Sequence, residues 1–163
     1  MTGVNLSNLI PGERLKSVSV EWKYPRLLDN FWYDEESGGY GLYYISRKFG
    51  NKETLLYIGQ TYDSYYNRLI CHDYNWLGNY RGKKYVRRGI ITSPVRRTDE
   101  DARQLLKDIE SMLIYEMRFL LQQNVMGVNS YKPSHLYSVT NTGYRGVLSA
   151  EISMRNHIAG EDE

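Results

Sequence analysis

The chain has 163 residues, of which 41% are hydrophobic and 25% charged, as expected for one globular domain large enough to bury a core. The net charge of +2 excludes an argument for nucleic-acid binding from overall charge, so such a role must depend on where the basic residues lie. The single cysteine, Cys71, excludes an internal disulfide, and the low number of histidines and cysteines argues against a zinc site.

The beginning of the chain gives no targeting signal. It has neither the basic start nor the long apolar run of a signal peptide, and the most apolar later segment, 112–121, is interrupted by Glu116 and Arg118. The sequence therefore predicts a cytoplasmic protein with no membrane partner. Residues 1–38 are predicted to form an N-terminal arm with an edge strand at 17–22. We expect this arm to pack on the domain, and a substrate-contacting arm is the alternative.

Residues 41–59 predict a β-hairpin, because two short runs of aliphatic and aromatic residues flank a polar turn that contains a glycine. If Ile45 pairs with Leu55, the alternation of side chains places Tyr43 opposite Tyr57 on one face. Two phenol groups would then project together from the hairpin.

A helix is predicted directly after the hairpin, with Asp63 or Ser64 as its N-terminal cap. Arg68 and His72 are four residues apart, so they lie one above the other on the same helix face. Taken alone, this pair is typical of a surface arginine and of a histidine stabilised by the helix dipole.

A third strand is predicted at 84–91, inside a segment that carries only basic charges. Its basic residues are Arg81, Lys83, Lys84, Arg87, Arg88, Arg96 and Arg97. Basic residues interleaved with tyrosines suit a phosphate backbone, because cations displace counterions and aromatic rings stack on unpaired bases. Lys83, Lys84, Arg87 and Arg88 are therefore predicted to contact nucleic acid. A strand edge protected by charge is an equal alternative.

The longest helix is predicted at about 100–122, with acidic residues in its first turn. Glu110 points into the apolar stripe of this helix, between residues such as Leu106 and Leu113. A buried carboxylate without a partner is costly, so Glu110 needs a metal, a cation or strong hydrogen bonds. A structural salt bridge is the alternative, and Glu116, at the edge of the stripe, is a weaker candidate.

The hairpin residues carry a resemblance to a known family. The Gly-Leu-Tyr at 41–43, followed by the Tyr-Ile-Gly at 57–59, resembles the paired motif of the GIY-YIG nucleases, with leucine in place of the usual isoleucine. The resemblance covers roughly residues 39–137. It implies an α+β fold with a small, mainly antiparallel three-stranded sheet flanked by helices. The N-terminal arm would precede this core, and residues 138–163 would form a C-terminal cover, as a last strand or irregular structure, with an acidic tail.

The resemblance also implies an active site. Its predicted catalytic residues are Tyr43, Tyr57, Arg68, His72, Glu110 and Asn129. The family expects an asparagine soon after the long helix, where Asn129 fits best and Asn124 competes. Glu110 would bind Mg²⁺ (or Mn²⁺), and Arg68 would bind the scissile phosphate.

The implied activity is that of a metal-dependent endonuclease that hydrolyses phosphodiester bonds of DNA. Tyr43 is the expected general base and Tyr57 would position water or phosphate, although the two roles could be exchanged. Nearby cations are expected to lower the pKa of the base, and His72 could accept its proton. Asn129 would brace the site by hydrogen bonding.

Two other functions remain open from the sequence: a catalytically inactive nucleic-acid-binding module and a tyrosine-rich protein-interaction domain. No second DNA-binding domain is recognisable in the sequence. Specificity would then come from this domain, a homodimer or a protein partner.

Overall fold

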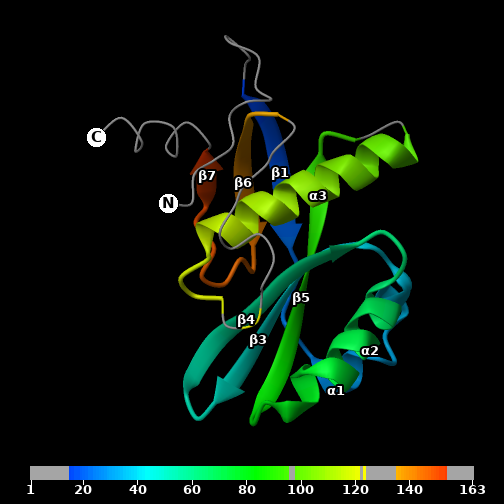
Figure 1. Cartoon of the computed structure of the whole chain (residues 1–163), viewed down its shortest axis with the longest axis vertical. Helices are drawn as coiled ribbons and strands as arrows, with labels where there is room; N and C mark the ends of the chain where they lie inside the picture. The colour runs from blue at the N-terminus through cyan, green and yellow to red at the C-terminus, as the bar shows by residue number, and fades with distance from the viewer. Residues whose placement is uncertain (1–14, 96–97, 122, 124–134, 154–163) are drawn as a thin grey trace.

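The computed structural model describes residues 15–95, 98–121, 123 and 135–153 (Figure 1). These residues form one mixed β-sheet with helices packed against it. In chain order the elements are β1 (Lys16–Trp22), β2 (Arg26–Leu27), α1 (Leu28–Phe31), the 3-10 helix η2 (Glu35–Gly38), β3 (Gly41–Phe49), β4 (Lys52–Thr61), α2 (Tyr65–Asn75), the 3-10 helix η3 (Leu77–Asn79), β5 (Lys83–Ser93), α3 (Asp99–Glu116), β6 (Tyr137–Gly143) and β7 (Glu151–Ser153).

The sheet has 7 strands, in the order β4-β3-β5-β1-β6-β7, with the short β2 also paired to β5. β1 and β6 are parallel, and the other pairs are antiparallel. The sheet curls into a half-barrel. The predicted small three-stranded sheet is therefore wrong. It corresponds to β3, β4 and β5, and it leaves out the strands that the flanking segments add.

The strand predicted near the N-terminus exists, but β1 lies inside the sheet and not at its edge. Val20 pairs with Ile91 of β5 on one side and with Asn141 of β6 on the other. Val18, Val20 and Trp22 are buried. Alternation of apolar residues shows which face of a strand is buried but not how many neighbours the strand has. The edge position was wrong for that reason.

The C-terminal segment completes the sheet through β6 and β7. Trp22 Nε1 donates a hydrogen bond to Asn141 Oδ1 at 2.9 Å, and the Asn141 amide donates to the Ser149 carbonyl at 3.0 Å. Asn141 is buried, so these bonds satisfy polar groups that would otherwise lose water on folding. They connect β1 with a segment that follows it by more than a hundred residues.

β3 and β4 form the predicted hairpin, but in a different register. Tyr43 pairs with Gly59, and Ile45 pairs with Tyr57, because the ladder shifts between Ile45 and Ser46. A β-bulge of this kind places two residues of one strand opposite one residue of the other. Tyr57 and Gly59 are two residues apart and share a face, so Tyr57 still lies on the same side of the hairpin as Tyr43.

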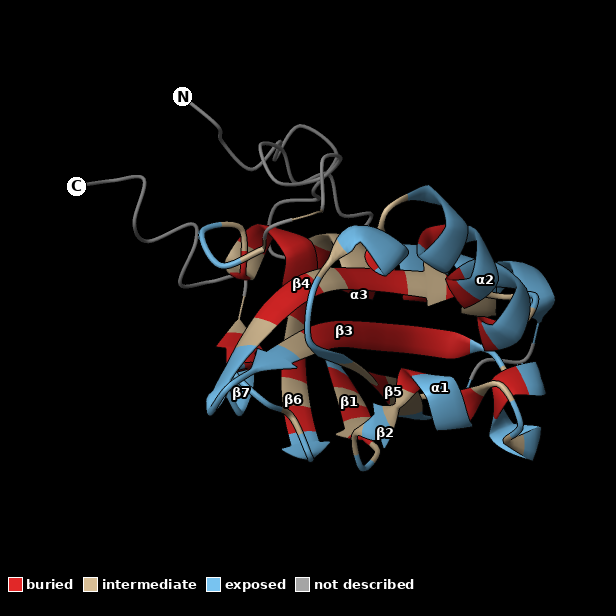
Figure 2. Cartoon of the chain, turned by 90° about the horizontal axis from the view of Figure 1, so that it is seen from below, coloured by how far each residue is buried: buried red, intermediate tan, exposed pale blue. Residues whose placement is uncertain are grey.

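β3 is buried on both faces for most of its length (Figure 2). Leu42 and Tyr44 belong to the core cluster that α3 covers, whereas Tyr43 and Ile45 belong to the cluster that α1 and α2 cover. Since neighbouring residues of a strand point to opposite faces, one short segment contributes to both cores. The hairpin therefore connects the layer of α3 with the layer of α1 and α2.

The two long helices begin at side-chain caps. Ser64, one of the two predicted caps, accepts a hydrogen bond from Asn67 N at 3.1 Å at the start of α2. Thr98 accepts one from Asp101 N at 3.2 Å at the start of α3. These bonds satisfy backbone N–H groups that have no partner within the helix. α3 ends at Glu116, earlier than predicted, and no helix of the described ranges is long and apolar enough to cross a membrane.

Candidate active site

The rings of Tyr43 and Tyr57 stack where β3 pairs with β4. Their centroids are 6.0 Å apart and their planes are within 11° of parallel. Gly59 makes this possible, because a Cβ atom at that position would lie 2.4 Å from Cζ and from the hydroxyl oxygen of Tyr43. The prediction of two phenols on one face is confirmed, although they occupy diagonal and not directly opposite positions.

His72, on α2, is held between two hydrogen-bonding partners. Its Nε2 lies 2.8 Å from the Tyr43 hydroxyl oxygen, and its Nδ1 accepts a hydrogen bond from Trp76 Nε1 at 3.0 Å. Burial, reinforced by the charge of Arg68, lowers the pKa of His72 to about 4, so the imidazole is neutral near pH 7. An indole N–H is only a donor, so the single imidazole proton must be on Nε2. His72 therefore donates to the Tyr43 oxygen and does not accept the Tyr43 proton.

Arg68 lies one turn before His72 on α2 and brings a positive charge to both phenols. Its guanidinium hydrogen-bonds Tyr43 and Tyr57, and the bond with Tyr43 is the largest of the effects that raise the pKa of Arg68. The residue is nevertheless exposed. The prediction that Arg68 and His72 share one helix face is confirmed, and the arginine remains accessible to an anionic ligand.

Burial raises the pKa of both phenols above the ordinary value for tyrosine. For Tyr43, burial is the largest cause and the neighbouring Tyr57 adds to it, while hydrogen bonding with Arg68 and its charge act in the opposite direction. The pKa of Tyr57 is also raised, again chiefly by burial. The expected lowering of the tyrosine pKa by the nearby arginine is present, but it is smaller than the effect of burial, so the net pKa of both phenols is raised.

Glu110, on α3, lies close enough to Tyr43 and Tyr57 for its negative charge to raise the pKa of both phenols. Burial raises the pKa of the Glu110 carboxyl to about 7, against a hydrogen bond from the Gln60 backbone N–H and the charges of Arg68 and Lys107. As expected, the Glu110 carboxylate is largely buried, and it has a hydrogen-bond partner. The described residues include no ion pair of Glu110, so the alternative of a structural salt bridge has no support among them.

Any metal ion at this position would rely on few protein ligands. No group of three or more His, Cys, Asp and Glu side chains among the described residues could hold an ion. Mg²⁺ is commonly bound by one or two carboxylates, with water and substrate phosphate completing its shell. A single, partly desolvated carboxylate such as Glu110 fits that donor set and does not fit a closed zinc site.

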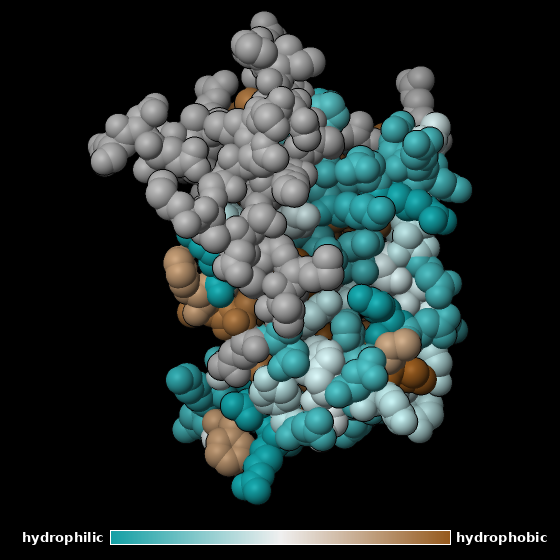
Figure 3. All heavy atoms as spheres, viewed as in Figure 1, coloured by the Kyte–Doolittle hydropathy of each residue, from teal (hydrophilic) through white to brown (hydrophobic). Residues whose placement is uncertain are grey.

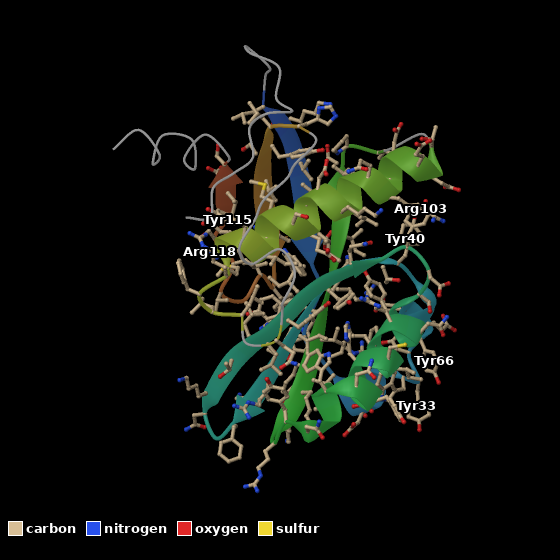
Figure 4. All side chains as sticks on the ribbon, viewed as in Figure 1. Tyr33, Tyr40, Tyr66, Arg103, Tyr115 and Arg118 are labelled. Atoms are coloured by element: carbon tan, nitrogen blue, oxygen red, sulfur yellow. The ribbon has the colours of Figure 1, made fainter. Side chains whose placement is uncertain are left out.

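A basic and aromatic surface precedes Glu110 along α3. The positive charge of Lys107 lowers the pKa of the Glu110 carboxyl. The guanidinium of Arg103 lies 4.6 Å from the centroid of the Tyr62 ring. Tyr62 packs against Tyr40 with ring centroids 4.7 Å apart. Figure 4 shows Tyr40 and Arg103 near each other at this end of α3. This surface has no local signal in the sequence, because its residues come from three separate segments.

The basic residues predicted to contact nucleic acid are not equally accessible. Lys83 is exposed and Lys84 is half-buried. They pair with β3 alone, because β2 and β1 cover the other side of β5 only from Tyr85 onward, so the alternative of a strand edge protected by charge still fits these two lysines but is wrong for the rest of β5. Two further basic residues of the segment, Arg96 and Arg97, lie outside the described residues.

Arg87 and Arg88 have partners within the fold. Arg87 is buried, bonds the Glu53 carboxylate at 2.8 Å and stacks 4.7 Å above the centroid of the Tyr44 ring. Arg88 bonds Glu36 at 2.5 Å. Their guanidinium groups are therefore engaged in structural contacts, which corrects the expectation that both are offered to nucleic acid.

Two of the three residues that complete the site, Trp76 and Gln60, were not singled out from the sequence, whereas Gly59 belongs to the Tyr-Ile-Gly motif at 57–59. Trp76 orients His72, Gln60 donates to Glu110, and Gly59 makes room for the Tyr43 ring. The spacing of four residues between His72 and Trp76 was a usable signal, since such pairs meet on a helix surface. The contact of Gln60 depends on tertiary packing and leaves no pattern in the sequence.

The structure brings together five of the six predicted catalytic residues: Tyr43, Tyr57, Arg68, His72 and Glu110. The sixth, Asn129, and its competitor Asn124 lie outside the described residues. No protein-family model matches the chain, and searches of curated proteins and of solved structures found no significant match.

Proposed function

We propose that this chain is an endonuclease that hydrolyses phosphodiester bonds of DNA with the help of a divalent cation. The observation that carries the proposal is that β3, β4, α2 and α3 contribute two phenols, a guanidinium, a neutral imidazole and a carboxylate to one place. Phosphodiester hydrolysis needs a group that binds the phosphate, a group that accepts a proton from water, and a ligand for a cation. This set supplies all three.

Arg68 is the residue suited to bind the scissile phosphate. Its guanidinium is planar and permanently charged, so it can form two parallel hydrogen bonds with phosphate oxygens. The residue is exposed, and its hydrogen bonds in the free protein go to the neutral phenols. A phosphate offers a charged acceptor in their place.

Tyr43 is the proposed general base, and its neighbours determine how readily its phenol loses the proton. The Nε2–H of His72 and the guanidinium of Arg68 both donate to its oxygen, which favours the phenolate form and partly offsets the larger, opposite effect of burial. Tyr43 first releases its phenol proton to solvent, and the phenolate then takes a proton from the attacking water while Tyr57 orients the water or the phosphate. The water oxygen bonds to phosphorus, the bond to the 3′ oxygen breaks, and the leaving oxygen takes a proton from solvent, which leaves a 5′ phosphate and a 3′ hydroxyl.

Glu110 is the residue that would hold the cation, Mg²⁺ or Mn²⁺. When bound, such a cation stabilises negative charge on the phosphate oxygens and on the leaving oxygen. In the free protein the Glu110 carboxyl has a pKa of about 7, so it exchanges its proton for a cation at little cost near neutral pH.

The experiment compares cleavage of supercoiled plasmid DNA in Mg²⁺ by the parent protein and by Glu110→Gln. Glu116→Gln, on the same helix, is the matched control for removal of a carboxylate. We expect nicking by the parent and by the control, and a rate lower by about 100-fold or more for Glu110→Gln.

Circular dichroism must show that all three proteins are folded. Equal cutting by all three proteins contradicts the proposal. Binding of DNA by the parent without cutting indicates the inactive module, and neither binding nor cutting indicates the interaction domain.

A further inference from the structure

The tip of the β3–β4 hairpin carries a second group of basic residues, at a distance from the catalytic residues. Arg47 of β3 lies directly opposite Lys84 of β5, and its other neighbour, on β4, is the uncharged Thr54. Like charges opposite each other in a sheet are destabilising. Among the described residues, no carboxylate forms an ion pair with Arg47 or Lys84.

On the opposite face of the same hairpin, an acidic residue lies beside the basic ones. Lys48 lies opposite Lys83 of β5, but its neighbour on β4 is Glu53, whose carboxyl pKa is lowered in part by the charge of Lys48. An acid therefore offsets the cations on that face. The unbalanced positive charge is confined to the face of Arg47 and Lys84, which β3 shares with the catalytic Tyr43.

An open cleft of about 570 Å³ lies on this face. Its lining residues are Arg47, Phe49, Asn79, Tyr80 and Arg81. The guanidinium of Arg47 lies 5.2 Å from the centroid of the Tyr80 ring, and its buried Nε has no hydrogen-bond partner among the described residues. Arg81 is exposed. Figure 3 shows a mainly hydrophilic surface at this end of the molecule.

A row of aromatic rings connects this cleft with the catalytic residues. Trp76 lies 5.5 Å from Tyr57 and 5.9 Å from Tyr80, measured between ring centroids, and Tyr80 lies beneath Arg47. Arg47 follows Tyr43 by four residues along β3, which is about 13 Å in a strand. Along B-form DNA that distance corresponds to about four base-pair steps of ~3.4 Å.

We propose that this cleft, which we call the hairpin-tip cleft, binds backbone phosphates of the DNA about four base pairs from the scissile bond, with Arg47 and Arg81 as the phosphate ligands. The inference rests on the proposed nuclease function. Two anchor points, Arg68 at the scissile phosphate and the hairpin-tip cleft at a distant one, fix the direction in which the duplex crosses the catalytic site. Arginine is suited to this role because its planar fork matches phosphate oxygens.

The first test measures binding of a fluorescent DNA duplex by anisotropy in the presence of EDTA, so that no cutting is needed for the readout. We expect Arg47→Ala and Arg81→Ala each to weaken binding by about fivefold and to reduce the slope of log K against log salt by about one. Lys48→Ala is the matched control, since it removes one cation from the adjacent residue on the opposite face, and its loss should stay below about twofold.

The second test uses duplexes shortened from either end relative to the cleavage position. We expect the parent protein to lose affinity when one particular flank is cut to fewer than about four base pairs, and Arg81→Ala to be insensitive to that change. Arg81 is exposed, so its substitution leaves the fold intact.

Parent-like binding by the Arg47 and Arg81 variants, or an equal loss in Lys48→Ala, overturns the cleft as a phosphate site. Failure of the nuclease proposal alone gives a different result, because the parent protein then binds DNA without cutting it. Weakened binding by both variants in a protein that never cuts DNA retains the cleft and rejects the enzyme.

Discussion

Single residues determine the direction of the hydrogen bonds in the proposed catalytic site. Trp76 donates to His72, and His72 in turn donates to Tyr43, because an indole N–H cannot accept and the imidazole is neutral. The order of these donors stabilises negative charge on the Tyr43 oxygen. A tryptophan that contacts neither substrate nor cation in this proposal thus positions the base.

We expect Trp76→Phe to lower the single-turnover cleavage rate by about 10- to 100-fold without changing DNA affinity. The substitution keeps an aromatic ring against Tyr57 but removes the N–H that faces His72. Nδ1 is then free to carry the proton, and Nε2 becomes an acceptor that stabilises the protonated phenol of Tyr43.

The control for that substitution is Trp32→Phe. Trp32 packs edge-on against Tyr66 with ring centroids 5.6 Å apart, and Figure 4 shows Tyr66 and Tyr33 on the outer side of α2. The control should cut DNA at the parent rate. A parent-like rate in Trp76→Phe contradicts the positioning role.

The depressed pKa of His72 makes stability depend on pH. The folded value is about 4 and the ordinary value is 6.5, so between these values the unfolded chain binds a proton at His72 and the folded chain does not. The stabilisation by neutral His72 is therefore complete above about pH 6.5 and is lost as the pH falls toward about 4. We expect the difference in free energy of unfolding between the parent and His72→Gln to shrink by about 2 kcal/mol from about pH 7.5 to about pH 5.

Urea unfolding of both proteins at each pH measures this difference, and the other histidines cancel in it. A difference that stays constant, or grows as the pH falls, would show that the folded protein holds His72 protonated.

The sequence could predict which residues meet in the site but not their protonation. Tyr43, Tyr57, Arg68 and His72 were singled out by the motif resemblance, and the periodicities of the hairpin and the helix place each pair on a shared face. Whether a phenol has a raised or a lowered pKa depends on the balance between burial and nearby charge, and burial follows from tertiary packing. The direction was therefore wrong for Tyr43.

At the scale of elements, the main difference from expectation is the position of β1. A peripheral arm would tolerate truncation of its side chains, whereas β1 lies between β5 and β6 with its apolar face in the core. We expect Val20→Ala to reduce the free energy of unfolding by about 2 kcal/mol, because it removes two buried methyl groups.

The matched control for β1 is Ser17→Ala, on the exposed side of the same strand, and its effect should be within about 0.5 kcal/mol. Chemical denaturation of both variants measures the two values. Equal and small effects would mean that β1 is not part of the core sheet.

The hairpin, the third strand and both long helices could be predicted because each has a local signal of composition, periodicity or capping. The register of the hairpin could not, since the shift next to Ile45 changes the pairing without changing the composition of either strand. The size of the sheet could not be predicted for a similar reason. The parallel pairing of β1 with β6 joins segments far apart in the chain.

At the scale of the whole molecule, the hairpin joins two separate cores and so determines where the site is. α2 packs on one core and α3 on the other, and the strands β3 and β4 contribute residues to both. Arg68 and His72 therefore come from one helical layer and Glu110 from the other, and the stacked tyrosines lie on the face of β3 and β4 that α2 covers. Movement of either layer would separate the proposed phosphate ligand from the proposed cation ligand.

The central claim is that residues from both layers act as one catalytic unit. The most direct measurement is the single-turnover cleavage rate of a defined DNA duplex by Tyr43→Phe, by Glu110→Gln and by the double variant. Groups that act as a unit are not additive, so we expect each single variant to be slower than the parent by about 100-fold or more and the double variant to be no slower than the worse single. A parent-like rate in either single variant, or losses that multiply in the double, would contradict the claim.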